Sequence, residues 1–151
     1  MALPQPFGAA APFQSVETNM ARPTSDFFIY PVNFLLLGAA AVVTQQLQFD
    51  ASSNFMWYYS TYAADANGAV QSESSRTYPL VDILITPTDT SSQFMQSAVP
   101  VTSMFGNAEN PFVLPAPRLI PARSSITFQV TNRDAANTNL RLQLIGVKQY
   151  L

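Results

Sequence analysis

Apolar and polar residues alternate along most of this chain with a period of two, which is the period of a β-strand with one buried face. Two segments near the C-terminal end, Ile126–Thr131 and Leu140–Leu144, follow this alternation without a break. The polar stretch 132–139 lies between them. We therefore expect the two segments to form an antiparallel hairpin.

The same period predicts strands earlier in the chain. Segment 27–43 (FFIYPVNFLLLGAAAVV) contains Pro31, Asn33 and Gly38 and has no Lys/Arg-rich flank, so it predicts two strands around a Gly-Ala turn rather than a membrane helix. Pro31 indicates an edge strand or a bulge. Alternation over 41–49 places apolar residues on one strand face and polar residues on the other: Val43, Leu47 and Phe49 against Thr44, Gln46 and Gln48.

An aromatic block occupies residues 55–59 (FMWYY). Strict alternation predicts Phe55, Trp57 and Tyr59 on one side of a strand, with Met56 and Tyr58 on the other. Three roles remain open for the block: packing in the core, a protein interface, or a platform that stacks on sugars. Interfaces are enriched in Trp and Tyr, which makes Trp57 and Tyr58 candidates for contact with a partner.

The remaining segments complete an all-β pattern. Residues 80–86 predict a mostly buried strand that Pro87 ends, and 99–105 a short connection with one helical turn. Four prolines punctuate an extended run over 111–121, which we expect to supply core or subunit contacts. Short strands with Pro, Gly and Asn between them and no amphipathic helix predict an antiparallel β-sandwich, most specifically a jelly roll, over residues 26–151.

Residues 1–25 are expected to form an extended Pro-rich N-terminal arm, because four prolines prevent a helix there. Phe7 and Phe13 are the apolar exceptions in this arm. Two interpretations remain open: a loosely held terminus, or a strap whose two aromatic side chains dock into a neighbouring subunit.

Composition argues against catalysis. The 151 residues include no histidine, no cysteine and only 16 charged side chains, so the commonest acid-base and nucleophilic groups are missing. We therefore expect no enzyme activity. A net charge of −2 gives no basic footprint for nucleic acid. Soluble monomers carry about 25% charged residues against 11% here, and this deficit predicts an oligomer.

No pattern predicts a catalytic, metal or cofactor site. Asp82 lies within an apolar strand, where we expect it to face solvent or to pair with an arginine such as Arg76 or Arg118. The Asn- and Asp-rich segments 65–68 and 132–139 contain oxygen ligands of the kind that calcium prefers. Turn formation accounts for both, since Asn and Asp bond to their own backbone.

Half of the chain resembles a known class of proteins. The pieces VPVTSMFG (Val99–Gly106), NPFVLPAPRLIPARSSI (Asn110–Ile126) and NLRLQLIGVK (Asn139–Lys148) carry a resemblance to small bacteriophage virion proteins of jelly-roll type. The resemblance implies a capsid decoration or cement protein on the virion surface, made in the host cytoplasm. It further implies a homotrimer that binds the major capsid protein of a phage head through terminal arms. From the charge and from segment 27–43, we expect neither nucleic acid nor a membrane as a partner.

This expectation has two alternatives: a neck or tail accessory protein of the same virion, and a carbohydrate- or receptor-binding β-sandwich. The second alternative predicts an exposed Trp57 or Tyr58. The residues that we expect at a protein interface come from the arm, the aromatic block and the Pro-rich run: Phe7, Phe13, Trp57, Tyr58, Phe112, Leu114 and Arg118.

Overall fold

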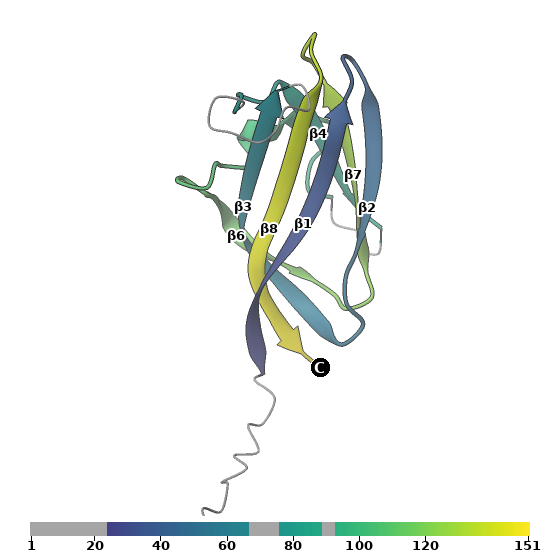
Figure 1. Cartoon of the computed structure of the whole chain (residues 1–151). Coiled ribbons are helices and arrows are strands. Elements are labelled where there is room, and N and C mark those ends of the chain that lie inside the picture. Colours follow the sequence, from purple (N-terminus) through teal and green to yellow (C-terminus); the bar gives the residue numbers. More distant parts are fainter. Residues whose placement is uncertain (1–23, 67–75, 89–92) are drawn as a thin grey trace, which may run out of the picture.

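The chain forms a β-sandwich of two antiparallel four-stranded sheets (Figure 1). The computed structural model describes residues 24–66, 76–88 and 93–151. Sheet A contains, in spatial order, β1 (Ser25–Leu37), β8 (Thr138–Tyr150), β3 (Ser53–Ala66) and β6 (Phe112–Ile120). Sheet B contains β2 (Val42–Gln48), β7 (Ser125–Asn132), β4 (Val81–Pro87) and β5 (Val99–Pro100). The predictions of an all-β chain and of a β-sandwich are therefore confirmed.

The strands pair in a nested order along the chain, the first with the last and so on toward the middle. β1 pairs with β8, β2 with β7, β3 with β6 and β4 with β5, all antiparallel. The start of β1 and the end of β8 meet at one end of the sandwich, where the Tyr150 N–H donates to the Thr24 carbonyl oxygen at 3.1 Å. Figure 1 shows the start of β1 and the C-terminus at this shared end.

The core lies between the sheets and is built by alternate residues of each strand, as the period of two requires. Sheet A contributes Phe34 of β1 and Leu142 of β8, and sheet B contributes Phe128 of β7 and Ile83 of β4, all of them fully buried. The alternation predicted for 41–49 is confirmed, since Val43 and Leu47 pack against the core while Thr44, Gln46 and Gln48 are exposed.

The predicted hairpin of Ile126–Thr131 with Leu140–Leu144 is wrong. These segments lie in β7 and β8, which belong to different sheets; β7 pairs with β2 and β4, and β8 pairs with β1 and β3. The polar connection crosses from one sheet to the other at the end of the sandwich. Alternation specifies which face of each strand is buried, and both arrangements bury the same faces.

The predicted turn between the first two strands is confirmed. It runs through Gly38–Ala40, and the Ala41 N–H donates to the Gly38 carbonyl oxygen at 3.1 Å. β1 lies at the edge of sheet A, as Pro31 indicated. The helical turn expected within 99–105 is the 3-10 helix η2 (Val101–Ser103). Across the described ranges, no helix combines the length and the apolar content needed to cross a membrane.

Candidate protein interface

A β-bulge in β3 reverses the predicted direction of Tyr59. The register with β8 runs from Trp57 opposite Gly146 directly to Tyr59 opposite Ile145, which leaves Tyr58 as the extra residue. The bulge shifts the alternation by one position. Trp57 is therefore fully buried, whereas Tyr59 is exposed, and the prediction that both lie on one side was wrong.

Close packing around Gly146 accompanies this bulge. A Cβ atom at position 146 would lie 2.0 Å from the Met56 carbonyl oxygen and 2.9 Å from the Phe55 ring, so the strands can approach this closely only at a glycine. On the other side of the bulge, the indole Nε1–H of Trp57 donates to the Tyr59 carbonyl oxygen at 2.8 Å. The buried indole thus satisfies its one donor with the backbone that the bulge redirects.

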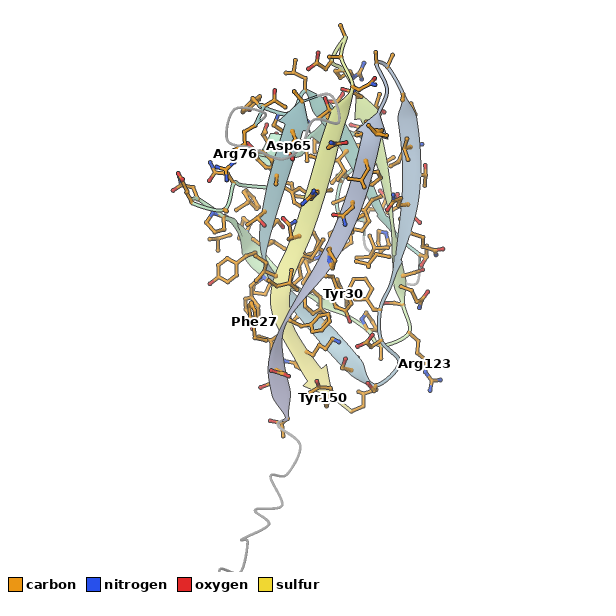
Figure 2. The ribbon with its side chains drawn as sticks, in the orientation of Figure 1. Phe27, Tyr30, Asp65, Arg76, Arg123 and Tyr150 are labelled. Atoms are coloured by element: carbon orange, nitrogen blue, oxygen red, sulfur yellow. The ribbon has the colours of Figure 1, made fainter. Side chains whose placement is uncertain are left out.

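With this phase shift, the outer face of sheet A carries two complete rows of apolar residues, and the second row owes its β3 member to the bulge. Cross-strand partners in one row run from β1 through β8 and β3 to β6, and the next row repeats the order. We call these eight residues the apolar face: Phe27, Val147, Met56 and Leu119 in one row, and Ile29, Ile145, Tyr59 and Val113 in the other. Figure 1 views the molecule with sheet A in front, and Figure 2 shows Phe27 and Tyr30 pointing in different directions from β1.

Much of the apolar face is open to solvent in this chain. The five most exposed members are Phe27 (65%), Ile29 (40%), Tyr59 (42%), Val113 (61%) and Leu119 (52%). An aromatic side chain buries roughly 150–250 Å² and an aliphatic one less, so at these exposed fractions the five residues together offer roughly 450 Å² of mostly apolar surface. This extent lies within the roughly 300–600 Å² of the largest apolar patch on a typical monomer, and such patches often have a function.

The rows that border the apolar face are uncharged. One consists of Pro31, Gln143 and Thr61, and in it the Thr61 hydroxyl donates to Gln143 Oε1 at 3.0 Å. The other contains Ser25, Gln149 and Asn54. An apolar centre with a neutral polar rim is the usual anatomy of a protein–protein interface.

The outer face of sheet B differs. We call its nine residues the polar face: Val42, Thr44, Gln46, Thr127, Gln129, Thr131, Asp82, Leu84 and Thr86. Seven of them are polar. At its end, Arg133 Nε donates to Asp82 Oδ2 at 2.8 Å. Arginine pairing of Asp82 is thus confirmed, with Arg133 in place of the expected Arg76 or Arg118.

The structure places five of the seven predicted interface residues, all on β3 and β6 of sheet A. Trp57 and Leu114 are buried in the core and have almost no surface left for a partner. Tyr58 is half-buried at the bulge, and Phe112 packs partly against the core. The Arg118 guanidinium lies 4.4 Å from the centre of the Phe94 ring. Phe7 and Phe13, with the rest of the predicted arm before residue 24, lie outside the described residues.

Sequence reasoning missed most members of the apolar face. One signal was present: Phe27-Phe28-Ile29-Tyr30 is apolar at four consecutive positions, and a strand that is apolar on both sides has both sides covered. The contributions of Tyr59, Val113 and Leu119 depend on the bulge and on the pairing of β6 with β3. No local pattern indicates either.

Asn132, where the polar loop after β7 begins, binds the backbone of that loop and the backbone of the turn between β1 and β2. The Asn132 amide nitrogen donates to the carbonyl oxygens of Leu37, Gly38 and Ala136 at 3.0–3.1 Å, and Asn132 Oδ1 accepts from the Asp134 N–H. The interpretation of 132–139 as turn chemistry is confirmed. Among the described residues, no three His, Cys, Asp or Glu side chains gather in a way that could hold a metal ion.

A buried lysine lies on the inner face of sheet A. The Lys148 ammonium is 3.3 Å from the centre of the Phe28 ring and forms an ion pair with Asp50. Burial alone would lower the pKa of Lys148, but the hydrogen bond and charge of Asp50 outweigh it and raise that pKa. Burial raises the pKa of the neighbouring Tyr30 hydroxyl. Lys148 therefore stays protonated at neutral pH, which suits an ion pair rather than a nucleophile.

Comparison with protein-family models, curated proteins and solved structures found no match for this chain. The features of the described residues that bear on function are therefore the apolar face, the bulge that completes it and the polar face of sheet B.

Proposed function

We propose that this chain is a non-enzymatic structural protein of a phage particle, a capsid decoration or cement protein of jelly-roll type. It acts as a homo-oligomer that binds the major capsid protein and stabilises the shell. The observation that carries the proposal is the apolar face, a broad association surface on a chain with little catalytic chemistry to offer. Association that buries such surface adds free energy that rupture of the shell must overcome.

Strand order supports the jelly-roll assignment. A jelly roll has eight strands in two sheets and contains two Greek keys. Here the nested pairs β1–β8, β2–β7, β3–β6 and β4–β5 are shared alternately between the sheets, as expected when one long antiparallel hairpin is rolled into a sandwich. Viral capsid domains are among the proteins that use this architecture.

The sugar-binding alternative has less support. It predicts an exposed Trp57 or Tyr58, but Trp57 is fully buried and Tyr58 is half-buried, with its ring centre 6.3 Å from that of Tyr59 and tilted by 37°. Flat stacking on a sugar ring requires an open aromatic face.

The proposal can be tested on intact particles. Phage particles would be purified from a lysate of the host that carries this sequence and incubated with antibodies against the purified chain. Gold labelling of the bound antibodies would then be imaged by electron microscopy. We expect regular labelling of the heads. Labelling of the neck or tail would favour the accessory alternative, and particles without label would overturn the proposal.

A further inference from the structure

The apolar face has no cover within the described residues, and its chemistry specifies what can cover it. Its eight members carry no charge, and neither do the two bordering rows. A charged or strongly polar partner would gain nothing there and would lose hydration. The cover must itself be apolar and nearly flat.

Among the described residues, the apolar face is the one broad apolar surface on a sheet. The other exposed large apolar side chains lie at strand ends or before β4: Leu35, Leu36, Val42, Tyr78, Leu80 and Leu151. The polar face offers mainly Thr and Gln. The described part of the chain therefore contains one surface that matches the apolar face, which is the apolar face of another copy.

We infer that a second copy of this chain covers the apolar face, with the two sheets A packed face to face across a two-fold axis. A two-fold contact uses the same patch on both subunits and needs no second complementary surface, whereas a closed three-fold ring needs two different ones. Two sheets pack at about 10 Å with interdigitating side chains, as in the interior of a sandwich. The inference names the self-association surface of the oligomer in the proposed function and rests on that proposal only for its biological setting.

The apolar face supplies more than half of the area that a standard pair buries on each partner. A standard interface buries about 800 Å² per partner, with an apolar centre and a polar rim. The exposed members of the apolar face supply roughly 450 Å² of that centre. The neutral rows around Gln143 and Gln149 supply a rim in which like charges do not meet across the axis. The polar faces then point outward on both sides of the pair.

The first test is the native mass of the full-length chain, measured by light scattering over a range of concentrations. One chain weighs 16.5 kDa, so we expect about 33 kDa. Leu119→Glu and, separately, Val113→Glu place two carboxylates in each two-fold contact and should raise the dissociation constant at least about 100-fold. Gln129→Glu adds the same charge at the centre of the polar face and should change the dissociation constant by no more than about twofold.

A second test does not depend on destabilising the contact. The chain contains no cysteine, so a single introduced cysteine can form only an intermolecular disulfide. Met56 lies near the centre of the apolar face, where a two-fold axis brings each residue close to its equivalent. Met56→Cys should form a covalent dimer under mild oxidation, since facing sheets can be bridged by a disulfide. Gln129→Cys on the polar face should not.

A monomer at all concentrations, a trimer, or a dimer that withstands both glutamate variants would overturn the inference. So would a dimer that is lost on removal of residues 1–23 while the glutamate variants leave it intact, because the arm would then hold the pair. Particle labelling is an independent readout. A dimer whose antibodies fail to label particles keeps the inference and removes the proposed function. Labelled particles with a monomeric chain remove the inference and keep only the virion part of the proposed function.

Discussion

The two sheets bury similar inner faces but present different outer faces. The outer face of sheet B carries Thr and Gln with an ion pair at its end, which is the ordinary pattern of a solvated antiparallel sheet. Sheet A presents two unbroken apolar rows outside and holds a charged lysine inside. Sheet A is therefore apolar on both sides, and only its inner side is covered by the described part of the chain.

The two outer faces differ because the strands of the two sheets keep their alternation differently. Sheet B keeps simple alternation along β2 and β7, so its polar residues stay outside. In sheet A, the bulge at Tyr58 changes the phase of β3 halfway along the strand and directs Tyr59 outward beside Ile145. Without that shift, the second apolar row would lack its β3 member.

The largest effect is expected where the bulge is packed. Gly146→Ala forces a Cβ against the Met56 carbonyl oxygen, so we expect the unfolding free energy to fall by about 3 kcal/mol. The strands would have to move apart at the bulge, which would disturb the alignment of the apolar face. Gly38→Ala is the matched control, because its Cβ would meet only ordinary contacts at 3.8–4.0 Å and should change stability by less than about 0.5 kcal/mol. Urea unfolding at one fixed protein concentration measures both. Equal stability of the two variants would mean that the close approach at Gly146 is not needed.

An intermediate effect is expected for the charge inside sheet A. Lys148→Ala removes the ion pair with Asp50 and the contact with the Phe28 ring, and should lower the unfolding free energy by about 2 kcal/mol. Lys148→Met keeps the apolar stem and should lose about half as much. If alanine and methionine were equally harmful, the packing of the stem would contribute nothing.

The same lysine predicts a dependence of stability on alkaline pH. Because the folded-state pKa values of Lys148 and Tyr30 are raised, the folded chain holds these protons more tightly than the unfolded chain. Their contribution is complete below the unfolded pKa values, near 10, and is lost as pH rises through the folded values. Urea unfolding between pH 8 and 11 should show this decline, and Lys148→Met should reduce its slope. An unchanged slope in the variant would exclude Lys148 as a source.

The smallest effect is expected on the polar face. Asp82→Asn breaks a pair whose arginine side chain is 65% exposed, so the change in unfolding free energy should stay below about 0.5 kcal/mol. The native mass should not change. Dissociation of the oligomer by this variant would contradict the assignment of the contact to sheet A, since the polar face would then be the contact surface.

The sequence predicted the structure well where a strand keeps its alternation of buried and exposed residues. It failed where the neighbouring strands determine pairing or register. The faces of β2, the turn at Gly38–Ala40 and the bonds from Asn132 to Asp134 and Ala136 were predictable, because each depends on residues within a few positions of one another. The proposed hairpin of β7 with β8 failed, since alternation does not identify the partner of a strand. Tyr59 was assigned to the wrong side because a bulge leaves no mark in the residue pattern.

By itself, the sequence determined that this chain is built of strands, which residues most of them bury, and that histidine and cysteine chemistry is absent. These properties follow from side-chain period and composition, which are local. The tertiary structure alone decided the nested pairing, the bulge opposite Gly146 and the alignment of Phe27, Ile145, Tyr59 and Val113 into one surface. Cross-strand register joins residues more than a hundred positions apart, and the free energy that selects it comes from packing the two sheets together.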